Sequence, residues 1–192
     1  MRRLYTKIIT FLIIITFCTS PVFAQSRRTS VRIVHLAPFA EDARVTISLD
    51  GDDILTEFDY GGSTLFIDGF RPGNHTIKIT PIGESEPVLE TSINLARPTS
   101  YTVVAIGDIE NRPLDLLVLE DDNAAPTAGY FKLRLGHLAP FANTLAGTTA
   151  DVRTDDDSVI LLDDVVFGDV DVYVEWPAGT YDLKITTADG ST

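Results

Sequence analysis

The chain has 192 residues, of which 44% are hydrophobic and 22% charged, and this composition is typical of a globular protein. Its formal net charge of −13 repels phosphate backbones, so we expect no nucleic acid among its partners. The single cysteine, Cys18, excludes an intramolecular disulfide.

Residues 1–24 are predicted to be a secretory signal peptide. A basic start is followed by an apolar run and by small residues before the expected cleavage site; these are Arg2, Arg3 and Lys7, residues 8–17, and Ser20 to Ala24. The apolar run is short for a membrane span, although an uncleaved anchor helix is the alternative. Cleavage would remove three basic residues and Cys18, which changes the net charge to −16. We therefore expect a secreted, periplasmic or cell-surface protein without a membrane span after signal cleavage.

A polar leader (25–30) precedes eight short extended runs with no helical period. The expected strands are residues 31–35, 43–49, 54–58, 65–70, 75–80, 88–95, 101–106 and 114–119. Asp50-Gly51 is typical of a hairpin turn, and residues 101–106 are apolar at nearly every position, which indicates a central strand. This pattern predicts an all-β sandwich over residues 31–120.

One short sequence segment occurs twice and indicates an internal repeat. The six residues from His35 to Ala40 are identical to those from His137 to Ala142. Residues 121–129 are polar and small with one proline, which is typical of a linker, so the second unit would span 130–192. We expect two tandem immunoglobulin-like antiparallel β-sandwiches.

The second unit is expected to be incomplete, because its match to the first ends at Thr186. It has no counterpart of the first unit's last three strands, so an apolar face or strand edge should be exposed. Two explanations stay open. Either the chain is a fragment of a longer protein, which we favour, or a strand from another chain completes the unit.

Several motifs resemble the domain-of-unknown-function 4397 family. They are the strand ending in Val34 to Pro38, the apolar run Tyr101 to Gly107, the stretch Leu117 to Asp122, Phe167 to Val170, and the turn Pro177 to Thr180. The resemblance covers nearly everything after residue 24. It implies an exported or surface protein of bacteria, often with the domain in tandem, and it supplies no biochemical role.

Two histidines are the strongest candidates for a metal-binding or catalytic site, because an imidazole can ligate a metal or act as a base. Each lies on the inward side of its strand just before a proline, in the pairs His35 with Pro38 and His137 with Pro140. We favour a structural role for all four residues, in which a ring nitrogen satisfies a loop carbonyl that would otherwise be buried and unpaired.

Clustered aspartates at two turns are the candidates for a metal site, with calcium as the ion. They are Asp50, Asp52 and Asp53 at one turn, and Asp155, Asp156 and Asp157 at its counterpart. Neither stretch has the spacing of an EF-hand calcium loop. We favour solvated turns, extend that interpretation to Asp121 and Asp122, and expect no cofactor.

The sequence lacks the usual motifs of catalysis, including a Gly-x-Ser-x-Gly elbow, a His-Glu-x-x-His pair and a phosphate-binding loop. Phe70, Trp176 and Tyr181 are interpreted as core residues, with a carbohydrate-stacking surface as the alternative. We therefore expect a non-enzymatic surface module for structure, adhesion or recognition, whose partner is an unknown protein or glycan. The alternative is a secreted carbohydrate-binding module or an accessory to a hydrolase.

Overall fold

The computed structural model describes residues 29–39 and 44–187 and is all-β. Thirteen strands and one short 3-10 helix make up the regular structure of these residues. They are β1 (Thr29–His35), β2 (Val45–Leu49), β3 (Asp52–Phe58), β4 (Ile67–Phe70), β5 (Gly73–Pro81), β6 (Leu89–Leu95), β7 (Ser100–Ile106), β8 (Asp115–Asp121), β9 (Tyr130–Leu133), η1 (Ala146–Thr148), β10 (Ala150–Thr154), β11 (Ile160–Val165), β12 (Val174–Pro177) and β13 (Leu183–Thr187). The predicted signal peptide lies outside the described residues.

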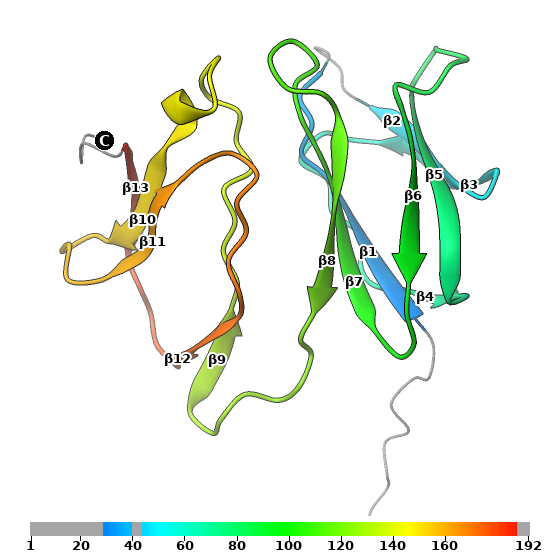
Figure 1. Ribbon diagram of the computed structural model, residues 1–192. Helices are drawn as coiled ribbons and strands as arrows, with labels where there is room; N and C mark the ends of the chain where they lie inside the picture. The colour runs from blue at the N-terminus through cyan, green and yellow to red at the C-terminus, as the bar shows by residue number, and fades with distance from the viewer. Residues whose placement is uncertain (1–28, 40–43, 188–192) are drawn as a thin grey trace, which may run out of the picture.

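Strands β1 to β8 form a first unit of two four-stranded sheets (Figure 1). One sheet has the order β4-β1-β7-β8 and the other β3-β2-β5-β6. All pairs are antiparallel except β1 with β7, which run parallel from Ser30 opposite Ser100 to His35 opposite Ala105. Among the described residues no helix is long and apolar enough to cross a membrane.

A single hydrophobic core lies between these two sheets. Alternate residues of β1, β2, β5 and β6 point into it, as the period-2 pattern of their sequences requires. Its buried members are Val31, Ile33, Ala37, Val45, Ile47, Ile77, Ile79, Ile93, Leu95, Tyr101, Val103 and Ala105. Strand β7 lies between β1 and β8, and its side chains are buried along nearly its whole length. The predicted central strand is therefore confirmed.

Three expected boundaries were wrong. Strand β1 begins at Thr29, so the end of the supposed leader is buried in the sheet. Strand β4 begins only at Ile67, and Leu65 before it is 89% exposed. Strand β8 continues to Asp121, which we had placed in the linker. In each case pairing with a neighbouring strand, and not local composition, decides where the strand begins or ends.

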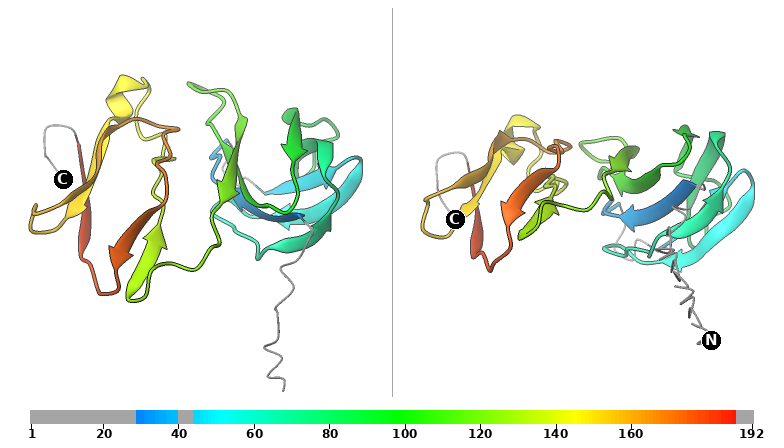
Figure 2. Two further views of the ribbon diagram at one scale, coloured as in Figure 1. Left: turned by 60° about the horizontal axis from the view of Figure 1, so that its bottom comes forward. Right: turned by 90° about the horizontal axis from the view of Figure 1, so that it is seen from below.

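Residues 130–187 form a second unit, which lies beside the first (Figure 2). It has a three-stranded sheet of order β11-β10-β13 and a two-stranded sheet of β9 and β12. Its turn between β10 and β11 corresponds to the Asp50-Gly51 turn between β2 and β3. The register of β10 on β13, with Val152 opposite Ile185, corresponds to that of β2 on β5, with Ile47 opposite Ile79.

Backbone hydrogen bonds around the repeated segment of the first unit also occur in the second unit. Four bonds of the first unit have counterparts of nearly the same length in the second. The pairs are His35 N to Gly62 O (3.0 Å) with His137 N to Asp169 O (2.8 Å), Gly61 N to His35 O (2.8 Å) with Gly168 N to His137 O (2.8 Å), Thr64 N to Ile33 O (2.9 Å) with Asp171 N to Leu135 O (2.9 Å), and Phe39 N to Ala37 O with Phe141 N to Ala139 O (both 3.0 Å).

Candidate functional site

A cavity of about 380 Å³ opens beside the acidic turn of the second unit. The turn between β10 and β11 contributes Asp155 and Asp156, and the segment between β12 and β13 contributes Tyr181 and Asp182. Trp176 of β12 forms another part of the wall. The cavity therefore combines aromatic surface with carboxylates, which suits recognition of hydroxyl-bearing or cationic groups.

The aromatic part of this wall is held in place by its own contacts. The Trp176 and Tyr181 rings meet edge to face with their centroids 5.0 Å apart. The Tyr181 hydroxyl donates a hydrogen bond to the Pro177 carbonyl at 2.7 Å. Both rings are half-buried and line an open cavity, so the prediction that they are core residues was wrong. Phe70, in contrast, packs against the core of the first unit.

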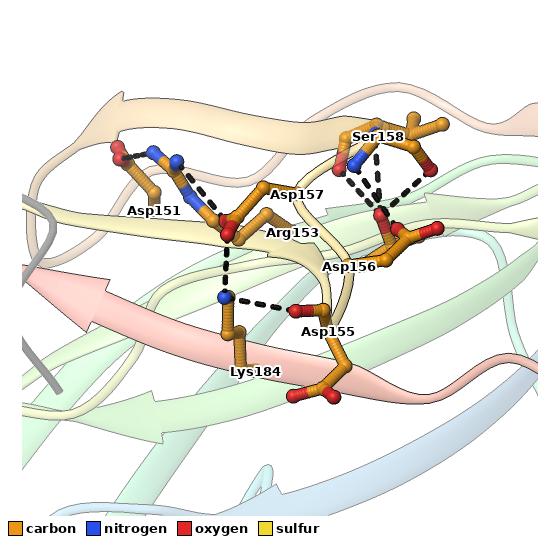
Figure 3. Close-up of polar contacts among 9 residues, drawn as sticks. Asp151, Arg153, Asp155, Asp156, Asp157, Ser158 and Lys184 are labelled. Atoms are coloured by element: carbon orange, nitrogen blue, oxygen red, sulfur yellow. Dashed lines mark hydrogen bonds and ion pairs between the residues drawn. The ribbon is translucent and has the colours of Figure 1, made fainter.

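The aspartates of this turn are engaged mainly with neighbouring side chains and amides (Figure 3). The Ser158 and Thr154 hydroxyls, together with the Ser158 amide, lower the pKa of Asp156 to about 2. Lys184 donates to Asp157 at 2.8 Å, and this contact, aided by Arg153, lowers the pKa of Asp157. The carboxylates of Asp156 and Asp157 thus already have protein partners.

The same lysine links the turn to β13. Lys184 Nζ also donates to the main-chain carbonyl of Asp155 at 2.9 Å. On the neighbouring strand, Arg153 pairs with the buried Asp151, whose pKa is lowered by the Asp164 amide and by Arg153. These contacts make the turn a preorganised wall of the cavity.

The acidic turn of the first unit is organised differently. Asp50 accepts hydrogen bonds from the Thr76 amide at 2.9 Å and from His75 Nδ1 at 2.7 Å. Asp52 and Asp53 are exposed at the start of β3. Within the described ranges no group of three or more His, Cys, Asp or Glu side chains is arranged to hold a metal ion.

The two repeated histidines lie at the ends of their strands against aromatic rings. His35 is fully buried, and its Nδ1 accepts a hydrogen bond from the Ala37 amide at 3.4 Å. His137 is half-buried, and its Nε2 donates to the Thr148 carbonyl at 2.7 Å. Each ring lies near the phenylalanine four residues later, with centroids 5.7 Å and 5.5 Å apart. Pro38 and Pro140 lie between these partners and are half-buried.

Sequence reasoning missed a buried polar network where the two units meet. The Asp121 side chain is only 1% exposed and accepts hydrogen bonds from Arg134 at 2.6 Å and from the Tyr173 hydroxyl at 3.0 Å. Thr102 of the first unit donates to its other oxygen at 2.7 Å. The interpretation of Asp121 as a solvated residue was therefore wrong. Arg134, which occupies the place of Arg32 in the repeat, was the available signal.

Arg112, in the loop between β7 and β8, forms a second connection between the units. It is buried, pairs with Asp108 at 2.9 Å, and donates to the carbonyls of Ala142 at 2.6 Å and Thr144 at 3.3 Å. Its guanidinium also lies over the Phe167 ring, 4.9 Å from the centroid. No pattern in the sequence distinguishes this arginine from exposed ones.

Comparison with known proteins identifies one family. No curated protein matches the chain in a sequence search. A family model described as "Domain of unknown function (DUF4397)" matches residues 29–148. The match begins at β1, includes all of the first unit and continues through β9 to η1 of the second. Because it covers more than half of the chain, the protein belongs to the DUF4397 family.

Proposed function

We propose that this protein is a non-enzymatic, extracytoplasmic module for adhesion or recognition. The predicted signal peptide supports the location, and the absence of catalytic motifs from the sequence supports a binding role. In this proposal each unit is an immunoglobulin-like sandwich and the second lacks its last strands. The recurring hydrogen bonds and the matching registers of the two units support the tandem organisation.

One observation carries the recognition role: the second unit exposes apolar side chains at positions that the first unit buries. Ile79 of β5 is 2% exposed, whereas Ile185, its counterpart in β13, is 69% exposed. Ile77 is 3% exposed and its counterpart Leu183 is 45% exposed. Neighbouring exposed apolar residues on one surface are typical of an interaction site. We therefore place the binding surface on the second unit.

The test combines peptide and glycan arrays with a search for turnover. The purified chain should bind one class of ligand saturably, and mass spectrometry should detect no cleavage of that ligand. Ile185→Asn should weaken binding, while Leu65→Asn, at an 89% exposed position of the first unit, should not. Turnover of a polysaccharide or peptide that is abolished by a single Asp or Glu substitution would contradict the proposal.

A carbohydrate-binding module, or an accessory to a secreted hydrolase, is the second candidate. The edge-to-face pair of Trp176 and Tyr181 beside Asp155 and Asp182 favours it, because aromatic rings stack on sugars and carboxylates accept hydrogen bonds from sugar hydroxyls. In this case Trp176→Ala should abolish binding on the glycan array. Ile185→Asn should leave that binding unchanged, which separates the two candidates.

A further inference from the structure

Strand β7 buries side chains on both of its faces, although the hydrophobic core lies on only one of them. Alternate residues from Tyr101 to Ala105 belong to the core between the two sheets of the first unit. The other face, which we call the outer face of β7, consists of Thr102, Val104 and Ile106. These residues are only 6%, 3% and 6% exposed. The outer face is therefore covered, although it lies outside the core.

The second unit meets this outer face near the start of β7. The Thr102 hydroxyl donates to Asp121, which also accepts hydrogen bonds from Arg134 and Tyr173 of the second unit. Asp121 is the last residue of β8 and pairs with Ser100, the first residue of β7. We call the group of Thr102, Asp121, Arg134 and Tyr173 the Asp121 anchor.

A second anchor lies at the other end of the hairpin formed by β7 and β8, on the side of the first unit that faces the second (Figures 1 and 2). There Arg112, in the loop after β7, donates to the Ala142 and Thr144 carbonyls and contacts the Phe167 ring. Strand β7 has seven residues, so the Asp121 anchor and this Arg112 anchor lie about 20 Å apart. Two attachment points at this distance oppose rotation of one unit against the other.

The Asp121 anchor joins two arginines that occupy the same place in the repeat. Each guanidinium lies over an aromatic ring, with Arg32 5.0 Å from the Phe66 centroid and Arg134 4.5 Å from the Tyr173 centroid. Arg32 donates to the threonine of the anchor at 2.9 Å, and Arg134 donates to its aspartate at 2.6 Å. One carboxylate, whose side chain is 1% exposed, therefore connects equivalent pairs from both units.

The segment between the units is also attached near both of its ends. The composition of residues 122–129 is typical of a flexible linker. In the structure, however, Asp122 accepts from Lys132 at 2.5 Å, and the Gly129 carbonyl accepts from the Ala178 amide at 2.8 Å. These contacts shorten the part of the segment that is free to bend.

We propose that the Asp121 anchor and the Arg112 anchor act together as an orientation lock, which holds the two units as one rigid body. Units joined by a linker and a small polar interface move against each other by default, so the lock changes the expected behaviour. In some proteins buried ionic groups select one arrangement more than they add stability, and we assign this role to Asp121. The inference concerns the geometry of the tandem and is independent of the proposed recognition function.

Pulsed electron-spin distance measurements between two nitroxide labels test the lock. The labels are attached through Asp53→Cys in β3 and Asp163→Cys in β11, which are both exposed positions. Cys18→Ser removes the natural cysteine of the chain. The chain with no further change should give one narrow distance distribution at low and at high salt, because ions screen buried charge pairs weakly.

Two variants of the Asp121 anchor should widen this distribution. Asp121→Asn removes the charge of the carboxylate and keeps its size. Arg134→Lys keeps the positive charge but cannot maintain two hydrogen bonds and the ring contact together. Each variant should widen the distribution about twofold or more, because the second unit is then held mainly at one end of the hairpin.

The matched control is Asp115→Asn, the same substitution at the other end of β8. This carboxylate is exposed and accepts a hydrogen bond from the adjacent Leu116 amide at 2.8 Å. The control should give the narrow distribution of the parent chain. Urea denaturation of all three variants verifies that both units are folded under the conditions of the measurement.

Three results would overturn the orientation lock. The first is a broad distribution in the chain without further change, because the units would then move freely. The second is a narrow distribution in both Asp121→Asn and Arg134→Lys, because the anchor would then not set the orientation. The third is equal widening in Asp115→Asn, because the effect would then not depend on the buried carboxylate.

Discussion

At the scale of single residues, His75 gives the first unit a pH-dependent contact. Burial opposes its charge, but hydrogen bonds with the Arg71 carbonyl and Asp50 outweigh burial and raise the pKa of His75 above 6.5. A histidine with a raised folded-state pKa stabilises the protein fully below its unfolded pKa, and this stabilisation is lost as pH rises through the folded value. We therefore expect the free energy of unfolding to fall between about pH 6 and pH 8.

Urea denaturation across this pH range would measure the effect. In the His75→Gln variant this part of the pH dependence should disappear, and Asp50→Asn should reduce it, since the carboxylate is one of the two partners. An unchanged slope in both variants would show that the pair contributes nothing.

Gly107 is a second residue whose role depends on local geometry. It follows β7 with φ of +101°, and a Cβ there would lie 2.3 Å from the Pro113 carbonyl oxygen. Gly107→Ala should therefore lower the free energy of unfolding by about 3 kcal/mol, through both backbone strain and a clash. Gly51 has a φ of +95° but no atom within 4 Å of an added Cβ, so Gly51→Ala should cost only about 1 kcal/mol. Equal losses of stability in the two variants would contradict the clash at Gly107.

At the scale of strands, β5 and β13 share a sequence pattern but differ in burial. Ile79→Ala should cost about 3 kcal/mol, because it leaves a cavity in a closed core. Ile185→Ala, at the corresponding position of β13, should cost less than about 0.5 kcal/mol, because that side chain is mostly in solvent. Chemical denaturation of the two variants compares them directly. A large loss for Ile185→Ala would mean that another segment covers this face in solution.

At the scale of the whole molecule, Arg112 is expected to couple the two units. Removing its side chain leaves Asp108 without its ion pair and the Ala142 and Thr144 carbonyls without their donor. Arg112→Ala should lower the free energy of unfolding by about 3 kcal/mol, because the ion pair is largely buried. In calorimetry of the Arg112→Ala variant, the second unit should melt at a lower temperature than the first.

The matched control is Arg44→Ala. This arginine pairs with Glu57 at 3.8 Å on the exposed surface, so its loss should change the stability by less than about 0.5 kcal/mol. If Arg112→Ala melted in one transition at the parent temperature, the two units would not depend on this contact.

The all-β class and all eight strands of the first unit were predictable from the sequence alone. Val45, Ile47 and Leu49 alternate with polar residues at the period of a strand. The turn at Asp50-Gly51 has the conformational freedom that a hairpin needs. These features depend only on residues that are close together in the chain, so the sequence alone predicts them.

Tertiary structure alone decided the rest. In the sequence Asp121 is an ordinary acidic residue, and its burial depends on Thr102 of the first unit and on Arg134 and Tyr173 of the second, which meet it there. Trp176 and Tyr181 were expected in a core, but the described part of the second unit has no strands to close over them. Burial depends on which distant segments pack together, and the one-dimensional pattern of a strand does not contain that information.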